Sequence, residues 1–465
     1  MFAVTALFFA AGAGAQAPPN PSSATNPYYG SITAHPATND IIQLSLDDAI
    51  HRGLENNLGL KQAEYAENAI HGQKMQALQE FLPTVTLFGQ TGFHQYNLAA
   101  LGFGPGLIDR FGLPPDFSFI TRATVTQGQL QVNQTLFSGP VIAGWKAAGA
   151  ATEAAHFTTT RARGEVVQQV ASAYLHAIAS ASEVDNAKAL EQANQVALDQ
   201  AHAAHEAGTA SNLDELRARV QLQAQQQVLI AAQNQFDKDQ ILLKREIGLD
   251  PGQNIVLSDR APYSELAAQT PEELRASAFK NRQDYQGLQS QLVELKAVHS
   301  AYRSQRLPSL TFSGNYGVTT IGSVGSHGTF EAVGTLSFPI FREARLRGDE
   351  EASRAQVDAA NSQLEDLRGK IDQQVRSALL DVDATGKLVE VSRSNVELAT
   401  RALSDETDRV NAGVDDNLPL VTAQATLANA QSRLVESLYQ YNLSKLALAR
   451  AAGVLEQEYR VYLGR

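Results

Sequence analysis

Few side chains in this sequence of 465 residues have the type and spacing that chemistry requires. His202 and His205 are three residues apart, which on a helix would place two imidazoles on one face, as in some metal sites. No carboxylate or further histidine completes this pair convincingly, so a solvated helix face explains both residues. There is no cysteine, which excludes disulfides, thiolate metal sites and a lipid attached to cysteine.

No arrangement for catalysis or cofactor binding is visible. The chain lacks a serine, histidine and acid set with an elbow motif. The glycine-rich run 102–106 is not followed by the lysine of a phosphate-binding loop. The net charge of -12 argues against nucleic acid, because phosphate binding requires clustered lysine and arginine. We therefore expect no enzymatic activity, no cofactor and no nucleic-acid partner.

Four segments combine β-strand character with an almost complete absence of charge, and their residues alternate between uncharged polar and apolar types. The polar positions that would line one face are Gln127, Gln129, Gln131 and Asn133 in the second segment and Thr311, Ser313 and Asn315 in the third. This alternation is typical of transmembrane barrel strands, whose inner face touches water. The alternative is an ordinary β-sandwich, which would leave the lack of charge and the export signal unexplained.

The first residues predict export. Residues 1–17 form an apolar run that closes on Ala15-Gln16-Ala17, the small-x-small site of a secretory signal peptide, although no basic region precedes it. We expect residues 18–44 to form a flexible segment. After residue 17, no apolar stretch approaches the length of about 20 residues that a membrane-spanning helix needs. If the chain spans a membrane, we therefore expect it to use strands.

The sequence contains a twofold internal repeat, which predicts the architecture. Leu82-Pro83-Thr84 recurs as Leu307-Pro308-Ser309, and Gln168-Gln169-Val170 recurs as Gln373-Gln374-Val375. Leucine and aromatic residues spaced seven apart follow in both halves, which indicates the apolar contact line of a coiled coil. Each half is thus predicted to contain a helix, two strands and a long helical hairpin.

The predicted boundaries follow from the proline positions and the apolar periodicity. The first repeat is predicted over 45–248, with a helix over 45–80, strands at about 83–97 and 122–137, and a long helix over 141–206. A connector over 249–270 follows. The second repeat is predicted over 271–455, with strands at about 308–321 and 329–341 and a long helix over 345–411, and a C-terminal tail over 456–465 ends the chain. Each long helix would extend for about 100 Å.

Four strands cannot close a barrel, and an open sheet edge cannot lie in hydrocarbon with unpaired backbone groups. The sheet must then be shared between chains. Two copies would give eight strands and an interior filled by side chains, whereas three copies would give twelve strands and an aqueous passage. The predicted fold class is mixed: four transmembrane β-strands per chain in a twelve-stranded trimeric barrel, with a long α-helical coiled coil.

The twofold repeat, the strand endings Leu136-Phe137 and Ile340-Phe341, and the Ala-Gly helix turns together resemble the TolC-type outer-membrane efflux family over about residues 42–455. The resemblance implies a location in the outer membrane of a Gram-negative-type bacterium, in contact with outer-membrane lipid, and a helical tunnel in the periplasm. It also implies a homotrimer, a periplasmic adaptor protein and an inner-membrane transporter such as an RND-type pump as partners.

In that family the helix turns at the periplasmic tip contact the adaptor. The corresponding positions in this chain are Ala207, Gly208 and Thr209 in the first turn and Arg409, Ala412, Gly413 and Val414 in the second. The family closes the tunnel mouth with acidic residues, for which the candidates are Asp214, Asp415 and Asp416. Pro419 stands where the family often has an aspartate, so the acidic gate departs from the family pattern.

The favoured function is a passive efflux channel of a tripartite export system, which conducts substrates from an inner-membrane pump across the periplasm and the outer membrane. A secreted or surface coiled-coil protein without a pore is the alternative from a different class. A channel dedicated to metal cations, with His202 and His205 as ligands, is the third hypothesis.

Overall fold

The structure is a computed structural model of the chain, and it describes residues 26–32, 36–102, 110, 112, 114, 118–209, 211–259, 263–323, 325–412 and 417–464. The expected signal peptide therefore lies outside the described residues. The chain divides into a helical unit, formed by Met1–Ala66, Phe157–Gln286 and Asp366–Arg465, and a unit that contains a four-stranded sheet, formed by Glu67–His156 and Gly287–Glu365. Among the described residues, no helix has both the length and the hydropathy needed to cross a membrane.

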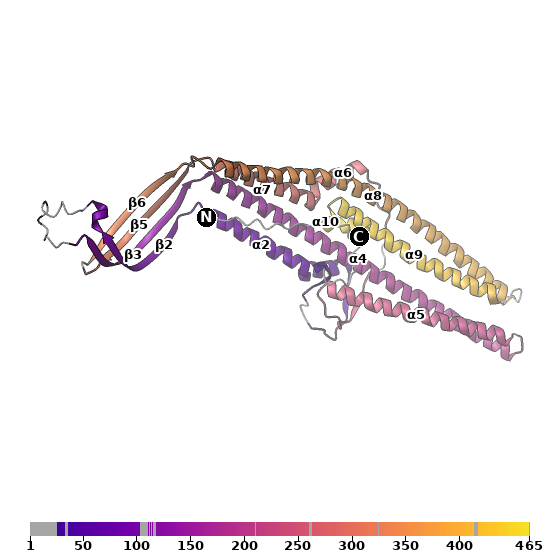
Figure 1. The fold of residues 1–465 in the computed structure, drawn as a ribbon. Helices are drawn as coiled ribbons and strands as arrows, with labels where there is room; N and C mark the ends of the chain where they lie inside the picture. Colours follow the sequence, from indigo (N-terminus) through magenta and orange to yellow (C-terminus); the bar gives the residue numbers. More distant parts are fainter. Residues whose placement is uncertain are drawn as a thin grey trace. The chain divides into compact units, whose positions relative to one another are not determined.

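The two halves of the sequence fold into the same order of elements (Figure 1). The first half contains α1 (Leu46–Asn56), α2 (Leu58–Gln79), β2 (Thr84–Asn97), β3 (Ile120–Phe137), α4 (Gly139–Glu206) and α5 (Asn212–Glu246). The second half contains α6 (Pro271–Asn281), α7 (Gln283–Ser304), β5 (Ser309–Ile321), β6 (Ser326–Ser337), α8 (Glu343–Asn411) and α9 (Asn417–Ala451). The long helices α4 and α8 contain 68 and 69 residues.

Local capping determines where the opening helices begin. Ser45 Oγ accepts a hydrogen bond from the Asp48 backbone N–H at the start of α1. Thr270 and Glu273 form a reciprocal capping box at the start of α6. These side chains satisfy backbone N–H groups that have no partner inside the helix. Both helices begin where the sequence predicts.

The opening helix of each half is interrupted, which corrects the expectation of one continuous helix over 45–80. Asn57 separates α1 from α2 and Arg282 separates α6 from α7, with extended backbone ψ angles of 128° and 121°. Asn57 is fully buried, donates to the Tyr28 carbonyl (2.6 Å) and accepts from the Leu60 backbone N–H (3.2 Å). Contacts with the N-terminal segment therefore hold the first interruption, and these contacts leave no periodic signal in the sequence.

A glycine with a positive φ angle lies against each interruption. Gly248 (φ 77°) lies beside Asn56, and Gly453 (φ 78°) lies beside Arg282. A Cβ atom at Gly453 would be 2.7 Å from the Arg282 backbone nitrogen, and one at Gly248 would be 2.5 Å from Asn56 Cβ. Both positions require glycine for backbone conformation and for space. The repeat thus preserves a contact between the end of each hairpin and the interruption of its opening helix.

A short parallel sheet joins the N-terminal segment to the connector. β1 (Ile42–Leu44) pairs with β4 (Ile255–Leu257), and the Leu44 carbonyl accepts a hydrogen bond from Tyr174 Oη (2.8 Å). The expectation of flexibility over 18–44 therefore does not hold for the last three residues of that segment. Strands of three residues that pair across such a distance in sequence have no periodicity of their own to reveal them.

The end of the chain forms a helix, α10 (Leu455–Leu463), where the sequence predicts a tail over 456–465. Tyr459 Oη donates a hydrogen bond to Asp47 Oδ1 (2.6 Å), and Tyr462 Oη donates to Gln269 Oε1 (3.3 Å). α10 therefore connects α1 of the first repeat with the connector between the repeats.

The core of the helical unit lies around the middle of α4. Its fully buried apolar side chains come from both repeats and from the N-terminal segment; they include Leu44, Leu46, Val166, Val170, Tyr174, Leu243, Ile247, Leu446, Leu448 and Leu463. Because these residues come from distant parts of the chain, the two repeats share one core in this unit.

Candidate channel elements

The four strands of the other unit form one antiparallel sheet in the order β2-β3-β5-β6. Gln131 pairs with Asn315, and Asn133 pairs with Ser313. Directly paired residues share a face of the sheet, so the register brings the predicted lining residues of two strands together. The residues on this polar face are Gln127, Gln129, Gln131, Asn133, Thr311, Ser313 and Asn315.

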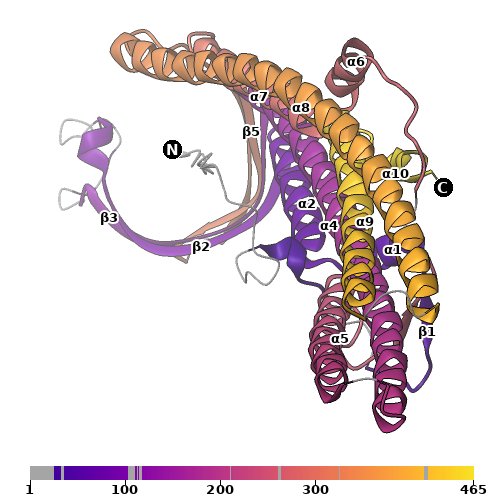
Figure 2. The ribbon, with the colours of Figure 1, turned by 90° about the vertical axis from the view of Figure 1, so that its right-hand side faces the viewer.

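The opposite face is apolar and more exposed than the polar one. Leu87 is 85% exposed, Phe330 74% and Phe93 72%, whereas Gln127 and Gln129 are half-buried. The strands curve strongly (Figure 2), so the less exposed face is the inner face of the curve. A sheet in water places its apolar side chains on the covered face. This sheet does the reverse, as expected for strands that face lipid on the outside.

Only two residues of the sheet, among its described strand residues, belong to the four charged types: Arg122 and Glu331. They lie on opposite faces. Arg122 pairs with Gln95 on the apolar face, and its Nε donates to Gln95 Oε1 (2.9 Å). Glu331 pairs with Asn315 on the polar face. Glu331 is not among the lining residues predicted from the sequence, although its parity with the polar positions of the fourth strand could have identified it.

The fourth strand ends earlier than predicted. The sequence predicts a strand at about 329–341, whereas β6 runs from Ser326 to Ser337. Its last residue pairs with Ser309, the first residue of β5, so residues beyond it have no partner in that strand. Pro339 also lacks the backbone N–H that a continuing strand would need. Ile340 and Phe341, expected at the strand end, lie after it and are exposed.

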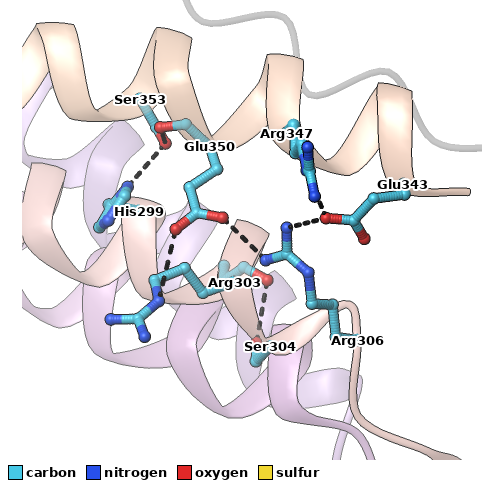
Figure 3. Close-up of polar contacts among 9 residues, drawn as sticks. His299, Arg303, Ser304, Arg306, Glu343, Arg347, Glu350 and Ser353 are labelled. Carbon is cyan, nitrogen blue, oxygen red and sulfur yellow. Dashed lines mark hydrogen bonds and ion pairs between the residues drawn. The ribbon is translucent and has the colours of Figure 1, made fainter.

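An ion-pair network joins the end of α7 to the start of α8 (Figure 3). Arg306 lies between two carboxylates: its Nη2 donates to Glu343 Oε1 (3.2 Å) and its Nη1 to Glu350 Oε2 (2.8 Å). Arg347 Nε donates to Glu343 (2.8 Å), and Arg303 lies 3.6 Å from Glu350. Hydrogen bonds from Arg347 and Arg306 lower the pKa of Glu343, and Arg306 lowers the pKa of Glu350. We call this set of five residues the ionic junction.

The corresponding place in the first half has no such ion pairs among the described residues. Phe81, which the repeat aligns with Arg306, contacts Trp145 near the start of α4. Their rings meet edge to face, with centroids 6.3 Å apart and planes at 82°. We call this pair the aromatic junction. The two strand pairs are therefore attached to their helices by different chemistry in the two halves.

The turn between α4 and α5 contains the first group of tip residues. Ala207, Gly208 and Thr209 are exposed, and Gly208 has a φ angle of 71°. Asp214, one of the acidic candidates, forms a capping box with Ser211 at the start of α5. The hydrogen bonds from Ser211 lower the pKa of Asp214, so this carboxylate is held in its charged form at the turn.

The second tip turn is described only in part. Arg409 lies in the last turn of α8, 3.9 Å from Glu406, and Ala412 follows the helix. The predicted residues Gly413, Val414, Asp415 and Asp416 lie outside the described residues. Their roles in adaptor contact and in the gate stay predictions.

The histidine pair does not form a recognisable metal centre. His202 Nδ1 lies 3.4 Å from Glu215 and Nε2 lies 3.5 Å from Glu206, while Arg219 also bonds Glu215 (3.0 Å). No group of three or more potential ligands is arranged for a metal ion in the part of the chain that the structure describes. His202 therefore takes part in a mixed ion-pair cluster that connects α4 with α5.

Two fully buried ionisable residues were not anticipated from the sequence. Glu246 accepts a hydrogen bond from Gln169 Nε2 (2.9 Å), and burial raises the pKa of Glu246 to about 8. Lys445 donates to the Ser264 carbonyl (3.2 Å) and lies 4.5 Å from the centre of the Tyr441 ring; burial lowers the pKa of Lys445 to about 8. Both lie at helical spacing from apolar residues, Glu246 three residues after Leu243 and Lys445 three before Leu448, so the spacing marks buried positions that the charged residue types conceal.

A further polar cluster connects three helices of the helical unit. His176 on α4 lies 3.0 Å from Asp239 on α5, and Ser180 Oγ donates to the same carboxylate. The His176 ring meets the edge of the Tyr439 ring on α9, with centroids 5.3 Å apart. The hydrogen bond with Asp239 raises the pKa of His176. This arrangement lacks a nucleophile bonded to the imidazole, and it serves to hold the helices together.

Comparison with known proteins agrees with the repeat. The profile of the family described as outer membrane efflux protein matches residues 49–249 and 274–454. The chain belongs to the outer membrane efflux protein family. The two matched ranges correspond to the two structural repeats, and the gap between them falls in the connector. The family resemblance inferred from the sequence is thereby confirmed.

Relatives in the outer membrane efflux protein family are distant in sequence. The toluene efflux pump outer membrane protein TtgF of Pseudomonas putida is 25% identical over 296 residues, which cover 62% of this chain and 60% of TtgF. The chain thus matches less than two thirds of the length of that relative. The outer membrane protein TolC of Escherichia coli is 21% identical over 389 residues, covering 76% of each chain.

Solved structures show the same fold. The CmeC outer membrane channel of Campylobacter jejuni superposes with a TM-score of 0.75 at 15% identity, covering 92% of each chain. A membrane protein from Pseudomonas aeruginosa has a TM-score of 0.75 at 20% identity, covering 88% of this chain and 93% of that one. The predicted combination of long helical hairpins and a β-sheet is confirmed, and the family confirms the predicted outer-membrane location.

Proposed function

We propose that this chain is one subunit of a passive efflux channel in the outer membrane, which conducts substrates delivered by an inner-membrane pump. The observation that carries the proposal is the reversed polarity of the sheet, whose exposed face is apolar and whose inner face is polar. Family membership supports the same function. A stalk without a pore would have no use for a polar face inside a curved sheet.

The open edges of the sheet support a trimer. β2 and β6 each pair on one side only within the described residues, and an unpaired edge is costly in hydrocarbon. Three copies would supply twelve strands, enough to surround an aqueous passage. Exposed apolar side chains along α5 and α8, such as Ile230 and Leu388, would also be covered by neighbouring copies.

The tips of the helical hairpins are the proposed contact with a periplasmic adaptor. The first tip presents Ala207, Gly208 and Thr209 to solvent, and small residues there allow another backbone to approach closely. Arg409 and Ala412 border the second tip. We propose that an inner-membrane transporter, such as an RND-type pump, is the energy source, since the chain contains no nucleotide-binding motif.

The proposed gate consists of carboxylates near the tips. Asp214 is the described member, and its bonds to Ser211 hold it at the turn rather than free in solution. Asp415 and Asp416 are the proposed partners from the second tip. Threefold repetition would bring several carboxylates together, which favours cations and repels anions at the tunnel mouth.

Single-channel recording tests this function. The purified protein should be trimeric by light scattering in detergent, and it should produce discrete conductance steps in planar bilayers. Asp214→Asn combined with Asp415→Asn and Asp416→Asn should lower the preference of the channel for cations, because the carboxylates that attract cations at the proposed gate are neutralised. A stable trimer that never conducts, with or without these substitutions, would favour the coiled-coil stalk instead.

A further inference from the structure

A single polar row crosses all four strands of the sheet. Thr86 on β2 pairs with Gln131 on β3, Gln131 with Asn315 on β5, and Asn315 with Glu331 on β6. Directly paired residues lie on the same face, so the four side chains form one row at one level. Glu331 is thus placed among the predicted lining residues and not on the apolar face.

The Glu331 carboxylate is held in this row by a neighbour. Asn315 Nδ2 donates a hydrogen bond to Glu331 Oε2 (2.9 Å). The flanking residues of β6 point to the other face by alternation, and they are the apolar Phe330 and the small Ala332. The carboxylate therefore has a defined position on the polar face, whereas the side chains of the two neighbouring residues lie on the apolar face.

Among the described strand residues, Glu331 is the only aspartate, glutamate, lysine or arginine on the polar face. The rest of that face consists mainly of amides and hydroxyls, together with His94 and His327 and a few apolar side chains such as Val125. Arg122, the sheet's other charged residue, lies on the opposite face. No lysine or arginine among the described strand residues therefore offsets the carboxylate on its own face.

We propose that Glu331 determines the ion selectivity of the sheet segment of the channel, where it favours cationic over anionic solutes. The inference rests on the proposed channel function and adds a second selective region, separate from the acidic residues at the helix tips. In a threefold assembly the three copies of Glu331 would lie at one height around the symmetry axis and would form a ring of three carboxylates. Rings of carboxylates favour cations in other channels for the same electrostatic reason.

The absence of cysteine makes the orientation of Glu331 directly measurable. In Glu331→Cys, the new thiol should react with a water-soluble cationic thiosulfonate, and the single-channel current should fall as the reagent adds a charged group to the pore. Ala332→Cys is the matched control, one residue further along β6 and on the opposite face. Its thiol should face lipid, react at least about tenfold more slowly and leave the current unchanged.

Ion selectivity gives the second measurement. The reversal potential in a potassium chloride gradient should show that Glu331→Gln lowers the preference for potassium over chloride by about twofold or more. Arg122→Gln removes a charge from the other face and should leave the reversal potential unchanged. Recording both variants also in the Asp214→Asn, Asp415→Asn, Asp416→Asn background separates the sheet from the tips.

The outcomes distinguish this inference from the proposed function. A channel that conducts but shows equal thiol reactivity at the two positions, or unchanged selectivity in Glu331→Gln in both backgrounds, would overturn the role of Glu331 alone. A reversal potential that responds to Arg122→Gln and not to Glu331→Gln would show that the two faces are assigned the wrong way round. Absence of conductance in the wild type would count against the channel itself.

Discussion

At the residue scale, the helical unit contains two buried ionisable groups whose titration affects stability in opposite directions. Burial disfavours the charged form of each group, so it raises the pKa of Glu246 and lowers the pKa of Lys445. Both residues come from the last turns of long helices, where the hairpins return to the shared core. The stability of this unit should therefore depend on pH, and replacing one of the two residues at a time should show the contribution of each.

Glu246→Gln should make the protein more stable than the wild type at neutral and alkaline pH. The folded-state pKa of Glu246 is about 8 and its ordinary value is 4.5, so the wild type loses stability as pH rises from about 4.5 to about 8. At 1.4 kcal/mol per pKa unit, the full loss is roughly 3–5 kcal/mol. Melting midpoints between pH 4 and 9 should show the variant gaining on the wild type as pH rises. A difference that does not change with pH would contradict the buried-carboxyl explanation.

Lys445→Met should have the opposite pH profile. The pKa of Lys445 is about 8 in the folded chain against an ordinary value of 10.5, so its destabilising contribution is complete below about pH 8 and disappears as pH rises towards 10.5. The variant should be more stable than the wild type by about 1–3 kcal/mol at pH 7. That advantage should shrink by pH 10. Lys387→Met, an exposed control on α8, should show no such change.

At the element scale, periodicity predicted the long helices and the four main strands, while contacts between distant segments determined what it missed. Proline positions and uncharged alternation lie within single segments, so the sequence reveals them directly. The interruption at Asn57 depends on the Tyr28 carbonyl, and β1 depends on β4. The early end of β6 was predictable in principle, because Pro339 is visible in the sequence.

Gly453→Ala should destabilise the protein more than Gly208→Ala. Both glycines have a positive φ angle, which costs a non-glycine residue about 1–2 kcal/mol. A Cβ at Gly453 would also approach the Arg282 backbone nitrogen to 2.7 Å, whereas nothing lies within 4 Å of a Cβ at Gly208. Thermal melting should compare the two variants, because Gly208→Ala introduces backbone strain alone and Gly453→Ala introduces the same strain together with a steric clash. Equal losses would mean that the packing at the helix interruption contributes little.

At the scale of the whole molecule, the exposed apolar face of the sheet and its two open edges support the proposed assembly of several copies of the chain. The polar face of the sheet could be predicted from the sequence, because alternation is local. Glu331 was missed although it has the same parity as the polar positions Thr335 and Ser337, because only uncharged polar residues were taken as candidates for the lining. The position of the gate stays a prediction, because Asp415 and Asp416 lie outside the described residues and Asp214 is described only in its capping box with Ser211.

Leu388→Gln should weaken the trimer without unfolding the helical unit. Leu388 is 56% exposed on α8 in the single chain, so its side chain gains burial only if another copy covers it. Covering that much of a leucine contributes about 1 kcal/mol per chain. Light scattering in detergent over a dilution series should show earlier dissociation of this variant. Glu390→Gln, two residues along the same helix, is the matched control and should dissociate like the wild type.

The different chemistry of the two junctions implies that the halves of the repeat respond unequally to ionic strength. Raising salt from about 0.05 to about 1 M shortens the screening length from more than about 10 Å to about 3 Å. Amide exchange around Arg306 and Glu350 of the ionic junction should then accelerate. The aromatic junction should not respond, and Trp145, the only tryptophan of the chain, reports on it through its fluorescence. A salt-dependent emission shift, absent in Phe81→Leu, would contradict this. In the duplicated architecture, the attachment through the ionic junction would thus depend on salt concentration, and the attachment through the aromatic junction would not.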